Sequence, residues 1–476
     1  NFGRIPIMVM GANCVLNKKD GATLEQNDEC AYDIGGYFII GGNEKVIISQ
    51  ERIAENEPFV FNNQKKNKCK EIEIRCSNDQ CFSVVIANLV RLLYRDNSLE
   101  FENPSLKNPV PLFILMKALG VATDKKLFEY IAWDMEDEFG KFITEILKSS
   151  FERFKKVCRN HCINTDAEPV KFQEIIINYL KFKNPNKELR LSHEDKLACV
   201  RKLLDEDVLP HLGKNYDKKA KFLGYMTRKL ILVQNGHMPF DDRDAYENKR
   251  VDAPGRLLAI QFRQCFNKLV KDMVKSITRE IKNNKSKRDV FEIITNNNIY
   301  KIIKPTIIDG ALKYALATGN WGIKTGGKGN IKAGTAQVLN RLSHQSFISH
   351  LRRVNSPSDK TGSNGKIIKP RKLHGSSWGY LCPAETPEGQ PVGLVKNLAL
   401  TAKITTNSNS HIVRAVIMTL GIKPIDTCDI DADIAANVLV FVNGDWLGIT
   451  TKPEEFITAL RRERRQANIN IFTGIH

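Results

Sequence analysis

The stretch CPAETPEGQPVGLVKN, residues 382–397, combines rigid turn residues with charges of both signs. Its first twelve residues include three prolines, two glycines and the glutamates Glu385 and Glu388, and Lys396 follows them. Because proline fixes φ and lacks a backbone donor, this composition predicts a stiff turn. The carboxylates are either a general acid and base pair or counter-charges for nearby cations. His374 is the one other proton-transfer group close in sequence, so the electrostatic interpretation is favoured.

The region around this turn is strongly basic. The chain has 476 residues with 72 Lys and Arg against 54 Asp and Glu, a formal net charge of +18. Residues 321–396 hold twelve Lys or Arg and three Asp or Glu, which is half of that net charge. Dense cations gain free energy by releasing the counterions condensed on phosphates, so this charge predicts a nucleic-acid partner. A membrane surface and an acidic protein are the alternatives.

Two glycine- and lysine-rich segments lie within the basic region. GIKTGGKG, residues 322–329, nearly matches a phosphate-binding P-loop, but Gly329 replaces the Mg²⁺-binding hydroxyl and a helix is expected before it. An NTPase site is therefore rejected. Residues 356–370 form the second segment, between the basic runs 350–353 and 370–374. We expect two flexible cationic loops that approach a phosphate chain closely, with an ordinary surface loop as the alternative for the second.

The cysteines and the apolar runs exclude other classes of protein. Eleven cysteines occur, an odd number without a CxxC pair, which predicts free thiols in a reducing compartment. Cys158, His161 and Cys162 are the one local group of soft ligands, and chance on a helix explains them better than a metal. No run approaches the ~20 apolar residues of a membrane span. Because Asn1 begins neither a signal peptide nor a Met start, we expect the chain to be cut from a longer one.

Apolar spacing divides the chain into several folded regions, as expected for about three times the typical domain length. Short apolar runs separated by glycine turns predict a small β-rich unit over residues 4–85, with the runs at 5–10, 37–40, 46–48 and 72–74. Apolar residues three and four apart predict helices at 111–119, 124–133, 138–157, 171–182, 193–204, 256–281 and 307–317, the last opening at Thr306 and ending at Gly319. Short strands return beyond residue 398, with a hairpin around Asn443 and Gly444. The predicted fold class is α+β, multidomain.

Three segments in fixed order carry a resemblance to a known family: LNRLSHQSFISHLRRVNSP (339–357), KPRKLH (369–374) and the stretch 382–397. With Trp378 and Gly379, they strongly resemble the second-largest subunit of multisubunit DNA-directed RNA polymerase. The similarity extends along nearly the whole chain, through GGYFIIGGNEK, QER, KALG, FLGYM, DDRD, KR, ALATGNW and FVNG at residues 35–45, 50–52, 117–120, 222–226, 241–244, 249–250, 315–321 and 441–444.

The resemblance implies an order of domains. Residues 1–101 and 251–322 correspond to the two parts of a mixed protrusion, and residues 102–250 to a mostly helical lobe inserted between them. Residues 323–402 correspond to a loop-rich fork, with fork loops 1 and 2 near 324–333 and 359–369. Residues 403–476 correspond to the start of a β-rich external region.

The resemblance also implies which residues bind nucleic acid: Gln337, Arg341, His350, Arg352, Arg353, Lys360, Lys366, Lys369, Arg371, Lys372, His374 and Lys396. Of these, Arg352, Arg353, Arg371, Lys372 and Lys396 are expected to converge on the path of template DNA and nascent RNA. Without counter-charges these cations would repel one another and hold phosphate too tightly for translocation. Glu385 and Glu388 are therefore interpreted as counter-charges on a rigid turn, with Glu388 restraining Arg371. The chain is expected to contain no catalytic residue, no metal site and no cofactor, because the family's catalytic Mg²⁺ belongs to the partner largest subunit.

The implied function is that of a part of DNA-directed RNA polymerase, a nucleotidyltransferase, which lines the DNA cleft and the downstream fork during transcription. Alone it should be inactive, because the family's hybrid-binding lysines and clamp lie in the C-terminal half. The implied partners are the largest and other polymerase subunits, template and non-template DNA and nascent RNA, with no membrane. The similarity to eukaryotic, archaeal and large-DNA-virus forms implies the nucleus or cytoplasm, with a viral factory or virion as an alternative. The alternative function is a free-standing basic nucleic-acid-binding protein without catalytic activity.

Overall fold

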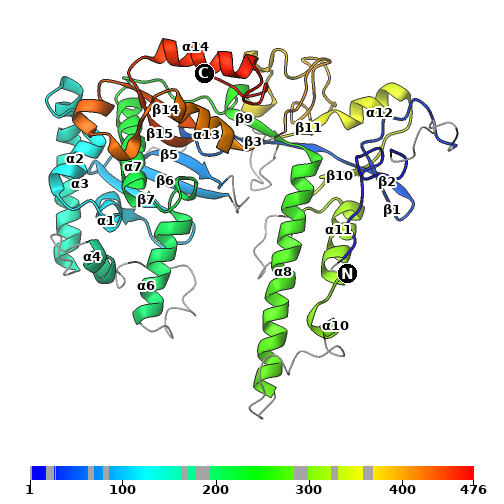
Figure 1. The fold of residues 1–476 in the computed structure, drawn as a ribbon, viewed down its shortest axis with the longest axis horizontal. Helices are drawn as coiled ribbons and strands as arrows, with labels where there is room; N and C mark the ends of the chain where they lie inside the picture. Colours follow the sequence, from blue (N-terminus) through cyan, green and yellow to red (C-terminus); the bar gives the residue numbers. More distant parts are fainter. Residues whose placement is uncertain are drawn as a thin grey trace. The chain divides into compact units, whose positions relative to one another are not determined.

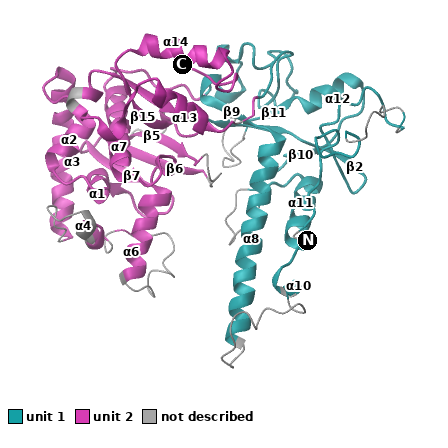
Figure 2. Cartoon of the chain, viewed as in Figure 1, with its two compact units in different colours: residues 1–53, 244–404 teal, residues 54–243, 405–476 magenta. Residues whose placement is uncertain are grey.

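The computed structural model of the chain contains both helices and sheets, which confirms the α+β class (Figure 1). It describes residues 3–17, 26, 28–62, 69–78, 85–161, 169–176, 180, 193–283, 299–322, 331–356, 368–406 and 408–476. The chain forms two compact units, each made of two separate segments (Figure 2). Unit 1 contains residues 1–53 and 244–404, and unit 2 contains residues 54–243 and 405–476.

Unit 2 is built around a five-stranded antiparallel sheet of order β4-β5-β6-β7-β8. Its strands are β4 (Pro58–Val60), β5 (Cys69–Cys76), β6 (Ile86–Leu93), β7 (Ser98–Glu102) and β8 (Val110–Pro111). Ile72, Ile74 and Cys76 alternate along β5 and are fully buried, as expected for a strand with one face on the core.

The helices that complete this core are α1 (Leu112–Ala118), α2 (Asp124–Ala132), α3 (Glu138–Asn160), α4 (Pro169–Ile176), α6 (His193–Lys202) and α7 (Tyr216–Gln234). The first three and α6 confirm the predicted helices, and α4 confirms the start of the helix predicted at 171–182, which extends beyond the described residues. Helix α7 was not predicted. Its Lys219 is fully buried and donates hydrogen bonds to the carbonyls of Leu204 and Asp205, so basic residues interrupt its apolar pattern.

The second segment of unit 2 contains α13 (Ser410–Thr419), β13 (Lys423–Pro424), β14 (Val438–Val442), β15 (Asp445–Thr450) and α14 (Pro453–Arg465). The predicted hairpin of β14 and β15 is confirmed, with positive φ at Asn443 and Gly444. A Cβ on Gly444 would lie 2.0 Å from the Asn56 carbonyl oxygen, so the turn fits closely against the first segment. The short strands predicted beyond residue 398 are confirmed, and the helices α13 and α14, which were not predicted, accompany them.

The described part of unit 1 contains two small sheets. One has the order β1-β2-β10, formed by β1 (Phe38–Ile40), β2 (Asn43–Ile47) and β10 (Ala336–Val338). The other has the order β12-β11-β3-β9, formed by β3 (Ser49–Ile53), β9 (Lys249–Asp252), β11 (Arg353–Asn355) and β12 (Val395–Asn397). Strands β3 and β11 are parallel, and the other pairs of this sheet are antiparallel. Segments more than 300 residues apart in sequence thus become neighbours in one sheet.

The helices of unit 1 are α8 (Pro254–Asn283), α10 (Ile299–Ile302), α11 (Thr306–Thr318) and α12 (His344–Leu351). Helix α11 lies beside α8 (Figure 1), and Cys265 and Leu269 of α8 bury against Ile308 and Leu312 of α11. Both predicted helices are confirmed. Helix α11 ends at Gly319, which adopts the left-handed conformation (φ 73°) expected of a C-cap glycine.

The small β-rich unit predicted over residues 4–85 is divided between the two units, because residues 37–48 belong to unit 1 and residues 72–74 to unit 2. The apolar run 5–10 forms no strand, although the Val9 amide donates to the Tyr37 carbonyl over 2.8 Å.

The domain ranges implied by the resemblance stay a prediction. Among the described residues, none of the helices combines the length and the apolar character that crossing a membrane requires.

Candidate nucleic-acid interface

The predicted site residues lie along unit 1 between β10 and β12. Helix α12 begins with a capping box, in which Ser343 Oγ accepts from the Ser346 amide over 3.2 Å and Ser346 Oγ accepts from the Ser343 amide over 3.0 Å. Strand β11 follows α12 almost directly, so Arg352 and Arg353 occupy the helix-to-strand junction. Lys360 and Lys366 lie outside the described residues.

Arg341 forms a clamp within the protein. Its guanidinium donates to both Glu44 carboxylate oxygens over 2.9 Å and to Asp33 over 3.0 Å. It also lies over the rings of Phe347 and Tyr37, 4.4 and 5.0 Å from their centroids. These contacts, led by the Glu44 hydrogen bonds, raise the pKa of Arg341 further. A bidentate, stacked guanidinium has few donors left for phosphate.

The side chains of His350 and Gln337 also contact other groups of the protein. His350 is only 4% exposed, its Nδ1 accepts from the Asn340 amide over 3.1 Å, and its Nε2 lies 3.0 Å from Gln337 Oε1. Because Nδ1 accepts, Nε2 carries the proton and the ring is neutral. Burial, reinforced by the Arg353 guanidinium, lowers the pKa of His350 to about 4. The pair therefore fixes β10 against α12.

Arg352 and Arg371 hold main-chain carbonyls. Arg352 Nη2 donates to the carbonyls of Ala399, Leu400 and Ala402, the latter two over 3.2 Å. Arg371 Nη1 donates to the carbonyls of Gln390 and Val392, the second over 2.9 Å. Each guanidinium thus closes a turn of the chain rather than pairing with a carboxylate.

Hydrogen bonds of one threonine side chain cross the turn 382–397. Thr386 Oγ1 accepts from the Gly393 amide over 2.9 Å and donates to the Val395 carbonyl over 3.1 Å. Gly393 has φ +70°, and a Cβ there would lie 2.2 Å from the Arg371 carbonyl oxygen. Side chains and close backbone packing therefore both restrain the turn.

The role of the two glutamates of this turn as counter-charges stays a prediction. Both are exposed, and among the described residues neither forms an ion pair. Glu385 accepts a hydrogen bond from Ser349 Oγ. No ion pair joins Glu388 to Arg371, whose Nη1 instead donates to two carbonyls of the same turn.

Lys396 has a different counter-charge, the buried Glu51 of β3. Its Nζ lies 3.3 and 3.4 Å from the two carboxylate oxygens of Glu51, and Lys249 Nζ lies 3.5 Å from the same carboxylate. Burial lowers the pKa of Lys396, and the Glu51 carboxylate opposes this shift. Burial alone would raise the pKa of Glu51, but the two ammonium groups and the Ser356 hydroxyl outweigh it and the net shift is downward.

The remaining predicted residues differ in exposure. Lys369 and Lys372 are exposed, and their side chains have no hydrogen-bond or ion-pair partner among the described residues. Arg353 is half-buried, and its Nε is buried without a hydrogen-bond partner. His374 Nδ1 lies 2.7 Å from Ser376 Oγ. Trp378, in the same segment, is 90% exposed, so cations and an aromatic face are both available to solvent there.

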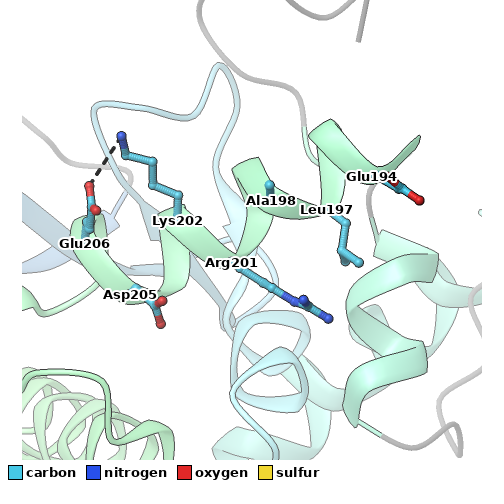
Figure 3. Close-up of a pocket in the computed structure, with 7 residues that line it drawn as sticks. All are labelled: Glu194, Leu197, Ala198, Arg201, Lys202, Asp205 and Glu206. Carbon is cyan, nitrogen blue, oxygen red and sulfur yellow. Dashed lines mark ion pairs between the residues drawn. The ribbon is translucent and has the colours of Figure 1, made fainter. Parts of the chain in front are cut away.

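No group of three or more His, Cys, Asp or Glu side chains suited to a metal occurs in the described parts of the chain. A hollow of about 460 Å³ in unit 2 is lined by Glu194, Leu197, Ala198, Arg201, Lys202, Asp205 and Glu206 (Figure 3). Lys202 and Glu206 pair there over 3.5 Å, with both side chains largely exposed. This charged, open hollow lacks the apolar enclosure typical of small-molecule sites.

Models of known families match three parts of the chain. The model described as RNA polymerase beta subunit matches residues 1–301, and those described as RNA polymerase Rpb2, domain 3 and domain 4 match residues 337–404 and 440–476. The chain belongs to the family of RNA polymerase second-largest subunits. All of the predicted interface residues of this second-largest-subunit chain, from Gln337 to Lys396, fall in the domain 3 match.

Relatives match over essentially the whole second-largest-subunit chain. It is 35% identical to DNA-directed RNA polymerase II subunit 2 of Arabidopsis thaliana and 32% identical to DNA-directed RNA polymerase subunit 2 of Acanthamoeba polyphaga mimivirus, with 100% of the chain covered in each. It is 36% identical to DNA-directed RNA polymerase II subunit RPB2 of Encephalitozoon cuniculi, with 98% covered. The chain spans only 38% of the length of each of these relatives.

Glu51 was missing from the predicted site residues of this second-largest-subunit chain. The signal in the sequence was the QER run at residues 50–52, which places a carboxylate between the apolar run 46–48 and Ile53. A charge in such a position is expected to have a partner when it is buried. The partner Lys396 lies 345 residues away, so its identity was not accessible from local pattern.

Proposed function

We propose that this chain is part of the second-largest subunit of a DNA-directed RNA polymerase and contributes to nucleic-acid binding during transcription. The match of the family models along the chain carries the proposal. The protrusion, lobe, fork and external ranges, and the two fork loops, are part of the same proposal. The nucleotidyltransferase activity belongs to the assembled enzyme, in which the largest subunit holds the Mg²⁺.

The proposed partners are the other polymerase subunits, template DNA, non-template DNA and nascent RNA. Lys369 and Lys372 support the nucleic-acid part, because they are exposed and unpaired among the described residues. Arg341, Arg352, Arg371 and Lys396 instead bind groups of the protein itself. The nucleus is the proposed location by analogy with the polymerase II relatives, and the mimivirus relative supports a viral site of transcription as the alternative.

The test is RNA extension by a polymerase assembled with the full-length subunit on a preformed DNA–RNA scaffold. The double variant Lys369→Ala, Lys372→Ala should lower the affinity of the polymerase for the scaffold. It should also make this affinity less dependent on salt, because each lost phosphate contact reduces the slope of log K against log salt by roughly one. Lys125→Ala, an exposed lysine of α2 that pairs with Glu129, is the matched control. Failure of the purified subunit to join any polymerase complex would instead favour a free-standing nucleic-acid-binding protein.

A further inference from the structure

The carboxylate of Glu51 joins three segments of unit 1. Glu51 is 3% exposed in the middle of β3, and the sheet order β12-β11-β3-β9 brings the other strands to it. Lys249 of β9 and Lys396 of β12 lie 3.5 and 3.3 Å from its Oε2. Ser356 Oγ, directly after β11, donates to the same oxygen. One buried acidic group therefore binds residues from every other strand segment of this sheet.

The two lysines depend on this carboxylate. Their side chains are only 10% and 17% exposed, and both ammonium groups lie near the Tyr246 ring, 5.9 and 6.0 Å from its centroid. The aromatic face favours cations, but it does not neutralise them. Removing the Glu51 charge would leave two partly buried ammonium groups that repel each other, with only the weaker attraction of Asp244 for Lys396 to oppose this, which is strongly unfavourable.

The same contacts link two parts of the predicted fork. Ser356 is where the chain leaves β11 toward Lys360 and Lys366, and its amide donates to the Leu394 carbonyl of the turn 382–397 over 2.8 Å. Lys396 lies at the end of that turn. Ser356 is therefore linked to the end of this turn in two ways: through its main-chain hydrogen bond to Leu394, and through the Glu51 carboxylate that it shares with Lys396.

We propose that Glu51 is a positioning residue that couples Ser356 to the end of the turn 382–397, and that Lys396 serves this coupling instead of binding nucleic acid. The functional consequence rests on the proposed role in polymerase, whereas the coupling itself does not. The QER run of the sequence, which no step of the proposed function uses, thereby acquires a role.

The coupling is tested by amide hydrogen exchange of the full-length subunit, followed in peptides that cover residues 353–356 and 394–397. Glu51→Gln keeps the size and an acceptor oxygen but removes the charge. It should speed exchange in both peptides by about tenfold or more, which corresponds to roughly 1.4 kcal/mol of local opening. Glu51→Asp, which keeps the charge, should recover part of the protection, and Ser356→Ala should affect the first peptide more than the second.

Lys372→Met is the matched control, since it removes a lysine of the same region that has no partner among the described residues. It should leave both peptides unchanged, whereas Lys396→Met should speed exchange in both. Faster exchange in only one peptide with Glu51→Gln, or equal effects of Lys372→Met and Lys396→Met, would overturn the coupling.

A functional measurement separates this inference from the proposed function. In the assembled polymerase, Glu51→Gln should slow opening of downstream DNA, reported by a fluorescent base analogue, with the KM for nucleotide unchanged and with recovery in Glu51→Asp. If Glu51→Gln speeds exchange in both peptides but does not affect the opening of downstream DNA, the positioning role stands and the proposed location of these segments beside the downstream fork is refuted. Normal exchange in Glu51→Gln would refute the positioning role whatever the polymerase does.

Discussion

Replacing Arg371 by alanine should loosen the turn 382–397, and Glu388 should have no part in the effect. Arg371 Nη1 donates to two carbonyls of this turn, those of Gln390 and Val392. A buried hydrogen bond from a charged group contributes roughly 1.5–3 kcal/mol, but Arg371 is half-exposed, so about 1–2 kcal/mol is expected for the two bonds together. Local opening should become about 5- to 30-fold more frequent.

The assay is hydrogen exchange in a peptide covering residues 389–395, with Arg371→Ala, Glu388→Ala and the double variant compared. Because no ion pair joins the two side chains, their coupling energy should stay below about 0.5 kcal/mol. A Glu388→Ala variant that exchanges as fast as Arg371→Ala, with no further change in the double variant, would refute this reasoning. A rate of nucleotide addition about 100-fold lower in Glu388→Ala would point instead to a general acid.

Three further outcomes are expected. Gly393→Ala should lower Tm far more than Gly389→Ala, because both glycines have positive φ but only the first packs against the Arg371 main chain, and equal losses would contradict this. Binding of the subunit to DNA should weaken steeply with salt, and Lys372→Ala should reduce the slope of log K against log salt by about one; an unchanged slope would exclude a phosphate contact. The pKa of His350 is lowered to about 4 in the folded chain, so its neutral ring stabilises the fold fully above the unfolded pKa of 6.5, and this contribution is lost as the pH falls toward 4. The denaturant midpoint should therefore fall less between pH 7 and pH 4 in His350→Gln than in the unchanged chain.

Elements with strong local signals were predictable from the sequence. The apolar period of α8, the Gly319 cap of α11 and the Asn443–Gly444 turn each depend on residues close together in the chain. Helix α7 was missed because its lysines interrupt the apolar face. Lys219 is buried where the main-chain carbonyls of Leu204 and Asp205 accept hydrogen bonds from its ammonium group. A buried lysine with such partners follows from tertiary structure, not from helical spacing.

The basic character of the candidate interface was predictable from the sequence, but the groups that each cation contacts were not. Counting charges identifies Arg341 and Lys396 as cations near the turn. Their partners Glu44 and Glu51 lie 297 and 345 residues away, and only the completed sheets bring them together. Exposure, rather than charge, therefore separates the residues that remain available for phosphate from those that stabilise the fold.

The two-segment composition of unit 2 has a consequence for biosynthesis. Phe222 and Tyr225 of α7 pack against Phe441 and Trp446 of the hairpin, with Tyr225 and Phe441 centroids 5.5 Å apart. The ribosome must translate the whole of residues 244–445 before Trp446 reaches this core, which takes roughly 10–40 s at about 5–20 residues per second. During that interval the aromatic face of α7 lacks its cover, so the nascent chain should recruit chaperones at this stage, and ribosome profiling of chaperone-bound chains should show release only after the hairpin has emerged.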